Sequence, residues 1–119
     1  MEKAELQLQI VADSPVTLPG LVLVIFIAKW PAVLNNQSID YINNFVKSFE
    51  ERVKVVGIDI AQSPDLAKKF GVHDVPMVFL LADGVEIASK IGILSSAVKV
   101  IEDAIKKHRE SILDKKPDV

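Results

Sequence analysis

The chain contains no cysteine among its 119 residues. This absence excludes disulfide bonds, thiolate metal ligands and a thiol nucleophile together. Aromatic side chains are also scarce, at 6% of residues, which argues against a surface on which nucleic-acid bases stack. The formal net charge is only −2, so no excess of one sign attracts the chain to nucleic acid or to an anionic membrane. We therefore expect neither of these partners.

Long hydrophobic runs are lacking as well. The most apolar stretch, Leu21–Ala28, is far shorter than the ~20 residues that a membrane-spanning helix needs. The first residues, Met1–Gln7, have neither the basic start nor the apolar core of a signal peptide. We therefore expect a cytoplasmic protein. The length predicts a single domain, residues 1–110, followed by a C-terminal tail at 111–119.

Several segments have the periodicity and composition of β-strands. Apolar residues alternate with polar ones near the N-terminus, whereas the second segment is apolar at every position and must be covered on both faces of a sheet. Asp83-Gly84 separates the last two segments and is a strong hairpin signal. The expected strands are Leu6–Ile10, Leu21–Ala28, Val53–Ile60, Met77–Ala82 and Val85–Ile91.

The remaining segments have helical patterns. The first long helix lies between residues 31 and 52, and begins either with Pro31 in its first turn or after Ser38 as its cap. A short helix, Asp65–Phe70, follows Ser63-Pro64, and a last helix follows Ser95 or Ser96, with an apolar stripe that extends toward Ile112. A short helical turn is also expected where Pro15 follows Ser14.

One stretch, Gly71–Leu81, joins a helix end to a strand. Gly71 suits the left-handed residue just past a helix C-terminus, where a β-carbon would clash. Pro76 then opens an apolar run, and proline is tolerated at the first residue of a strand because it has no N–H to donate. We expect the Val75–Pro76 bond, placed between a helix end and a buried strand, to be cis.

The order of these elements and several motifs resemble thioredoxin. Val24–Trp30 resembles the second strand of that family with its terminal tryptophan, and Val55–Pro64 resembles its third strand and the following helix start. Gly71–Pro76 resembles its cis-proline segment, and Ile91–Ser95, after Asp83-Gly84, its closing hairpin. The similarity covers roughly residues 21–108. It implies a thioredoxin-like three-layer α/β/α sandwich with a mixed central β-sheet and a cis-proline before strand 4.

The residues that carry thioredoxin chemistry are missing. The positions of the family's Cys-Gly-Pro-Cys motif read Pro31, Ala32, Val33 and Leu34. By the same resemblance, the buried aspartate beneath the redox pair is replaced by Ile25, and the lysine that faces it by Gly57. Thiol–disulfide exchange needs an attacking thiolate and a resolving thiol. The resemblance therefore implies a redox-inactive member that is not an enzyme.

The surface around the lost motif is better preserved. In thioredoxins an extended partner segment pairs with the backbone of the residue before the cis-proline, a form of β-augmentation. Here that residue is Val75, and Asp74 stands where the family usually has a small residue. The partner-binding residues that the resemblance implies are Trp30, Ile60, Val75, Pro76, Ile91, Gly92 and Ile93.

Three functional hypotheses follow. The first is a redox-inactive module that binds a protein or peptide partner through this face, as an adaptor, assembly factor or chaperone-like holder. The second is a structural homodimer that buries the face with residues 31–34 against a second copy. The third, weaker hypothesis is an enzyme that holds a glutathione-like peptide, although no activated nucleophile is evident. His73 and His108 lie far apart in the sequence, so we expect no metal and no cofactor.

Overall fold

The computed structural model describes residues 6–28, 36–92 and 94–114. Its centre is a four-stranded mixed sheet in the order β2-β1-β3-β4. The parallel pair is β1 with β2, and β3 is antiparallel to both β1 and β4. The strands are β1 (Leu21–Ile27), β2 (Lys54–Asp59), β3 (Met77–Ala82) and β4 (Val85–Ile91).

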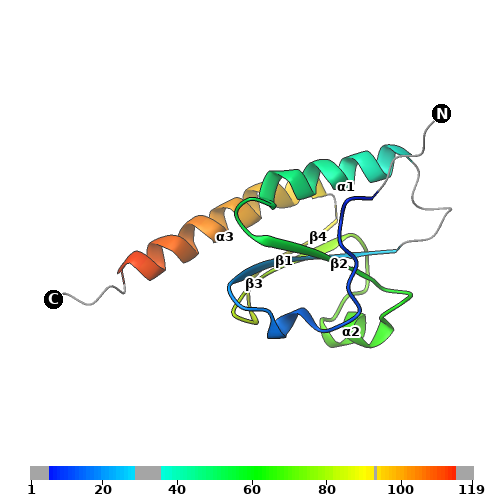
Figure 1. Cartoon of the computed structure of the whole chain (residues 1–119), viewed down its shortest axis with the longest axis horizontal. Coiled ribbons are helices and arrows are strands. Elements are labelled where there is room, and N and C mark those ends of the chain that lie inside the picture. The colour runs from blue at the N-terminus through cyan, green and yellow to red at the C-terminus, as the bar shows by residue number, and fades with distance from the viewer. Residues whose placement is uncertain (1–5, 29–35, 93, 115–119) are drawn as a thin grey trace.

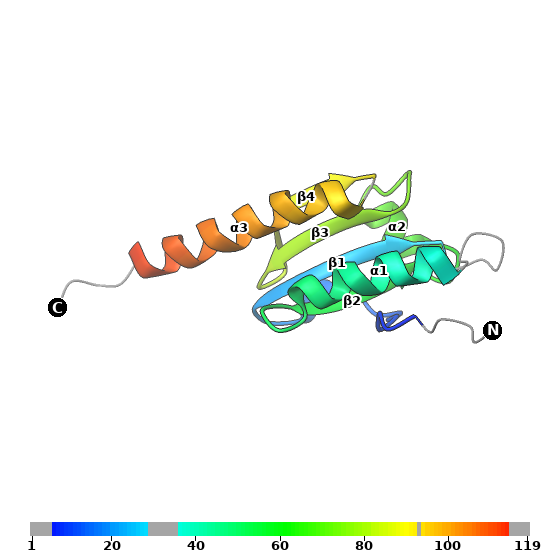
Figure 2. The same cartoon turned by 90° about the horizontal axis from the view of Figure 1, so that it is seen from above.

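Helices cover both faces of this sheet, as Figure 1 and Figure 2 show. One face carries α1 (Asn36–Phe49) and α3 (Leu94–Asp114), which run across it side by side. The other face carries α2 (Pro64–Lys69) and a 3₁₀ turn, η1 (Pro15–Thr17). This is the expected three-layer α/β/α sandwich, so the prediction of the fold is confirmed. No helix within the described ranges has both the length and the apolarity needed to cross a bilayer.

The centre of the core is β1, whose alternate side chains enter two separate hydrophobic clusters. Ile25 is fully buried on the side of α1 and α3. Val24 and Phe26 are buried on the side of α2, where the Phe26 ring meets Phe79 edge to face, with 5.6 Å between ring centroids. A strand that is apolar at every position is therefore covered on both faces, as its pattern predicted.

The stripe predicted for α1 also packs as expected, with Ile42, Phe45, Val46 and Phe49 all buried. Residues 36–38 are already helical, so Ser38 is not the cap. The alternative start at Pro31 lies outside the described residues.

The N-terminal segment differs from the prediction, because Leu6–Ile10 does not form a regular strand. Only Ile10 makes a bridge, with Gly57 of β2, and the amide of Gly57 donates to the carbonyl of Gln9 at 2.7 Å. Two residues before Gln9 the chain leaves the sheet, because the amide of Gln7 donates to the side-chain oxygen of Asn43 on α1, at 2.8 Å. That hydrogen bond replaces a continued ladder with β2.

The last helix is longer at both ends than the sequence indicated. It begins at Leu94, so Ser95 and Ser96 are inside the helix, and the amide of Ser95 donates to the hydroxyl oxygen of Tyr41 on α1, at 2.6 Å. It ends at Asp114, so residues 111–114 are helical and do not belong to a tail. Ile112 lies on the predicted stripe but is 56% exposed, because α3 projects past the end of the sheet (Figure 1).

The turns follow the sequence signals closely. Gly71 has φ +71° and its amide donates to the carbonyl of Lys68 at 3.0 Å, which ends α2. Asp83 and Gly84 both have positive φ values, 48° and 84°, as the tightest hairpin turns require. Ser63 stands at the N-cap of α2, although its side chain makes no capping hydrogen bond. The Val75–Pro76 peptide bond is cis, the isomer that the sequence analysis expected.

Candidate functional site

The topology brings several of the predicted contact residues to one end of the sheet. The parallel strands β1 and β2 both finish at this end, where the amide of Ile60 donates to the carbonyl of Ile27 at 2.9 Å. The antiparallel β3 begins here, just after Pro76, and β4 finishes beside it, where the amide of Gly92 donates to the carbonyl of Pro76 at 3.0 Å. Ile60, Pro76 and Gly92 therefore form a row along the sheet end.

We call this row the Pro76 face and define it by the predicted residues that the structure describes: Ile60, Val75, Pro76, Ile91 and Gly92. The other predicted contacts, Trp30 and Ile93, lie outside the described residues, and so do Pro31, Ala32, Val33 and Leu34 of the missing redox motif.

The middle of the Pro76 face offers backbone groups that are free to pair. Val75 is half-buried, because its side chain packs against the cluster on the α2 side of the sheet. Neither its amide nor its carbonyl makes a hydrogen bond to any part of the chain that the structure describes. A fixed strand end with unpaired backbone groups is the geometry that an added strand uses.

The rim beside Val75 is open and apolar. Ile91, the last residue of β4, is 51% exposed. Gly92 has φ +103°, and a β-carbon built on it would meet no atom of the described residues within 4 Å, its chain neighbours aside. Within the part of the chain that the structure describes, a second backbone can therefore approach this residue closely.

The charged groups near the face do not form an acid–base pair. His73 and Asp74 are exposed in the loop before Val75, and the carboxylate of Asp59 accepts a hydrogen bond from the amide of Ala61 at 2.9 Å. Among residues 6–28, 36–92 and 94–114, no three acidic or histidine side chains are grouped as metal ligands.

An ion pair of the described residues lies elsewhere, between Arg52 after α1 and Glu102 on α3. The hydrogen bonds from the guanidinium of Arg52 lower the pKa of Glu102, and the same contact raises the pKa of Arg52. Arg52 also lies over the ring of Phe49, 5.2 Å from its centroid. This pair joins two helices and takes no part in the Pro76 face.

Apolar side chains pack at the two positions where, by the resemblance to thioredoxin, a buried aspartate and a lysine would lie. Ile25 is fully buried and lies opposite Gly57 in the β1–β2 register. The N-terminal segment crosses over Gly57, so a β-carbon there would lie 2.5 Å from Cδ2 of Leu8 and 2.8 Å from Cδ1 of Ile10. The space above Gly57 is therefore filled by two aliphatic side chains, and no charged group fits there.

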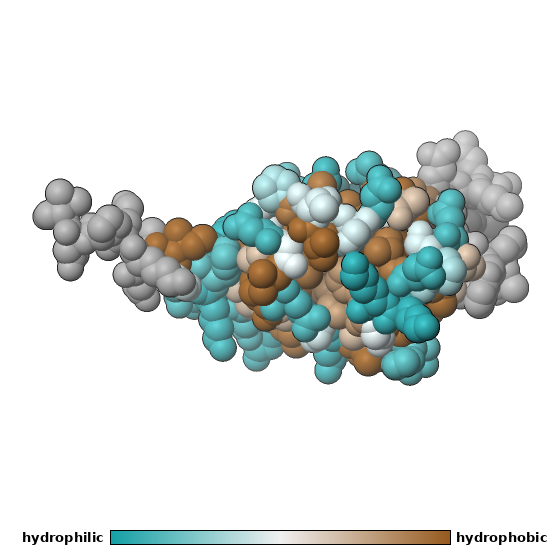
Figure 3. Space-filling model, turned by 90° about the horizontal axis from the view of Figure 1, so that it is seen from below, coloured by the Kyte–Doolittle hydropathy of each residue, from teal (hydrophilic) through white to brown (hydrophobic). Residues whose placement is uncertain are grey.

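The surface seen from the side of α2 is a mosaic of hydrophobic and hydrophilic residues, without one dominant apolar patch (Figure 3). The exposed large apolar residues are instead concentrated on β4, which carries Val85, Ile87 and Ile91. Sequence analysis missed two features of this region. One is the contact of Tyr41 with α3, and the other is a groove between β4 and α3. Both depend on residues far apart in the chain, and no local pattern signals them.

Comparison with known proteins connects this geometry to one family. The model of the Thioredoxin family matches residues 13–107. A thioredoxin from Rickettsia bellii is 32% identical over 74 residues, which cover 60% of this chain and 68% of that protein. One from Rickettsia felis is 31% identical, with the same coverage.

Solved structures agree on the fold. A mutant thioredoxin from Halobacterium salinarum superposes with a TM-score of 0.64 at 22% identity, covering 87% of this chain and 96% of the other. A thioredoxin from Nicotiana alata gives a TM-score of 0.63 at 24% identity, covering 91% and 97%.

Proposed function

We propose, from the premise that this chain belongs to the thioredoxin family, that it is a redox-inactive member that binds another protein through the Pro76 face. It acts as an adaptor, assembly factor or chaperone-like holder and not as an enzyme. The observation that carries this proposal is the backbone of Val75, which has no hydrogen-bond partner within the described residues and lies on the same face as exposed Ile91 and Gly92.

The loss of thiol chemistry supports the first half of the proposal. A chain without cysteine supplies neither the attacking thiolate nor the resolving thiol of disulfide exchange. The burial of Ile25 opposite Gly57 supports it further. A buried carboxylate or ammonium costs several kcal/mol unless it is paired or used, and a protein that no longer transfers protons is more stable with aliphatic packing at that place.

The geometry of the sheet end supports the second half. A partner segment in extended conformation finds one donor and one acceptor on Val75, and Gly92 itself carries no side chain that would keep the segment at a distance. Backbone pairing of this kind provides affinity, while side-chain contacts provide specificity. Ile91 offers an apolar contact on one side of the segment, and half-buried Ile60 offers another on the far side.

The charge beside the face favours one class of partner segment. Asp74 is exposed immediately before Val75, so a lysine or arginine on the approaching segment gains an opposite charge and an acidic residue meets repulsion. We therefore propose an extended segment that combines an aliphatic side chain with a neighbouring basic one.

Affinity capture from an extract of the native cells tests this function. The immobilised wild-type domain is compared with Ile91→Glu, which places a carboxylate on the rim. Ile91 is half exposed at the end of an edge strand, so we expect the capture to be lost while the melting temperature changes by less than about 3 °C.

The matched control is Val85→Glu, the same chemical change at the other end of the same strand, where the side chain is 65% exposed. It should capture the same proteins as the wild type. Equal capture by wild type, Ile91→Glu and Val85→Glu would show that the Pro76 face is not the contact. If size analysis instead gives a dimer that Ile91→Glu dissolves, the face is covered by a second copy and the adaptor role is wrong.

A further inference from the structure

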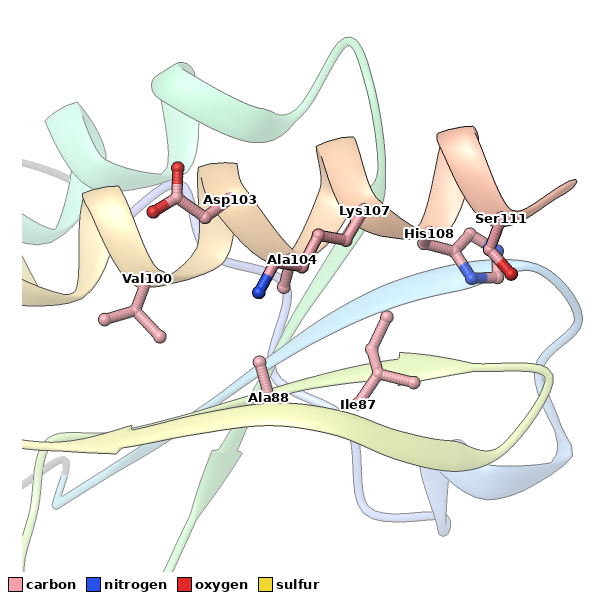
Figure 4. Close-up of a pocket in the computed structure, with 8 residues that line it drawn as sticks. All are labelled: Ile87, Ala88, Val100, Asp103, Ala104, Lys107, His108 and Ser111. Carbon is pink, nitrogen blue, oxygen red and sulfur yellow. The ribbon is translucent and has the colours of Figure 1, made fainter. Parts of the chain in front are cut away.

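A second surface lies away from the Pro76 face, where α3 passes over the edge strand β4. The two elements enclose an open groove of about 550 Å³. Figure 4 shows that its side chains come from one side of α3 and from the middle of β4. The lining residues are Ile87, Ala88, Val100, Asp103, Ala104, Lys107, His108 and Ser111.

The floor of this groove is apolar and partly uncovered. Ile87 on β4 is 38% exposed, and small side chains at Ala88 and Ala104 leave room above it. The helix also continues beyond the body of the molecule, so Ile112, two turns after buried Ile105, is 56% exposed. Ile87 therefore lies in the groove and Ile112 just beyond its last lining residue, Ser111, so both leave apolar surface open along one line of α3 and β4.

The rim of the groove carries charges of both signs. Asp103 and Lys107 line it from α3, and both are exposed. Neither has an ion-pair partner within the described residues, where Arg52 pairs with Glu102 instead. A rim of one sign would call for a partner of the opposite sign. A rim that holds one acid and one base, a single helical turn apart, is complementary to itself.

We propose that the groove is the dimer interface of this protein, occupied by α3 of a second copy in antiparallel orientation. In that arrangement Asp103 of each copy faces Lys107 of the other, and a two-fold axis passes between them. Such an isologous contact is the commonest way in which identical chains associate. The small residue Ala104 lets the two helices approach closely, and Ile112 lies along the first half of the partner helix.

The size of the surface fits a modest dimer. A stable interface takes about 800 Å² from each partner, or about 20 residues a side. The eight residues that line the groove, together with Ile112, are fewer than this number, so the interface belongs at the small end of the range. The contact is short and its rim polar, so we expect a dissociation constant on the order of 10 µM.

The proposed dimer leaves the Pro76 face free. Helix α3 begins beside that face and runs away from it, so Asp103 and Lys107 lie about 14–20 Å farther along its axis. The dimer would therefore present two separate binding faces, which makes the protein bivalent and raises its apparent affinity for a partner with repeated sites. This dimer is distinct from one that would bury residues 31–34.

Sedimentation equilibrium of charge-reversed variants tests the interface. Asp103→Lys places two like-charged contacts in the dimer, and so does Lys107→Glu, so each variant alone should dimerise at least about 10-fold more weakly than the wild type. When the two variants are mixed, each heterodimer has one contact between the two unchanged residues, Lys107 of one copy and Asp103 of the other. The second contact joins the two substituted positions, whose charges are again opposite but exchanged. The mixture should form a heterodimer with close to wild-type affinity.

The control is Lys106→Glu, which makes the same change of charge on the side of α3 that points away from the groove. It should leave the dissociation constant within about twofold of the wild type. A wild-type protein that stays monomeric at several hundred micromolar, a mixture that does not recover, or an equal loss with Lys106→Glu would each overturn the proposal. None of these substitutions touches the Pro76 face, so the result is independent of the partner-capture experiment.

Discussion

Substitution of Gly57 by alanine tests the packing of Leu8 and Ile10 over Gly57, at the position where the resemblance to thioredoxin would lead one to expect a buried ion pair. The added β-carbon would lie 2.5 Å from Cδ2 and 2.7 Å from Cγ of Leu8, far inside van der Waals contact. Leu8 is 4% exposed and belongs to the core on the side of α1, so it has little room to move. Overpacking of this kind costs about 1–3 kcal/mol, which corresponds to a fall in melting temperature of about 3–10 °C for a chain of this size.

A double-mutant cycle separates this clash from any general effect of the substitution. Leu8→Ala alone should destabilise the protein by about 2–4 kcal/mol, because it leaves a cavity in a buried cluster. In the Leu8→Ala background the two closest contacts of the alanine at position 57 are gone, and the contact with Cδ1 of Ile10 at 2.8 Å remains. The cost of Gly57→Ala should then fall by about 1 kcal/mol or more.

Chemical denaturation followed by circular dichroism gives the four unfolding free energies. A Gly57→Ala cost that is the same with and without Leu8 would refute the reasoning. A Gly57→Ala variant more stable than the wild type would refute it as well. Either result would mean that the N-terminal segment does not fill the space above Gly57.

Three smaller predictions concern contacts outside the Pro76 face. Tyr41→Phe removes the hydroxyl that accepts the amide of Ser95 at 2.6 Å; it should cost about 1 kcal/mol and speed the hydrogen exchange of that amide, and an unchanged exchange rate would contradict the contact. Arg52→Ala should cost less than about 1 kcal/mol, because the pair with Glu102 is exposed to solvent. The folded-state pKa of Glu102 is lowered, so the stability from this pair is present above the usual glutamate pKa. It is lost as the pH falls through the lowered pKa. In Arg52→Ala this part of the acid dependence of stability should disappear. Gly71→Ala should cost about 1 kcal/mol through its φ of +71° alone, since no atom of the described residues beyond its chain neighbours lies within 4 Å of the added β-carbon. A thermal melt equal to that of the wild type would contradict this.

The sequence predicted the elements whose causes are local. The uninterrupted apolar run at Leu21–Ala28 could only be a covered central strand, and β1 is that strand. Gly71 and Asp83-Gly84 occupy backbone conformations that few other residues adopt, so they located the end of α2 and the β3–β4 hairpin correctly. These signals depend on periodicity and on backbone sterics, which neighbouring residues determine.

The errors of prediction occur where distant residues decide the outcome. Apolar and polar residues alternate in Leu6–Ile10 as in a strand, but the amide of Gln7 donates a hydrogen bond to the side chain of Asn43. The ladder with β2 therefore stops after a single bridge. Serines near the start of the last helix were expected to cap it, whereas Tyr41, more than fifty residues earlier, accepts the amide of Ser95. Neither partner can be recognised from the residues nearby.

The candidate site was predicted only in part, and for the same reason. Its residues were named by resemblance, and the strand order then brought Ile60, Val75, Pro76, Ile91 and Gly92 to one sheet end. Alternation in β4 predicted a half-buried strand, yet almost all of its side chains are exposed. This strand lies at the edge of the sheet, and α3 covers only part of it.

Hydrogen exchange at the amide of Val75 tests the central claim most directly, because this amide has no partner within the described residues. The measurement is made by NMR on the labelled domain, first alone and then with a partner protein recovered by capture. If a partner strand pairs with the Pro76 face, exchange at Val75 should slow by at least about 10-fold on binding. Protection that appears elsewhere, while the Val75 amide exchanges as fast as in the free protein, would contradict the account.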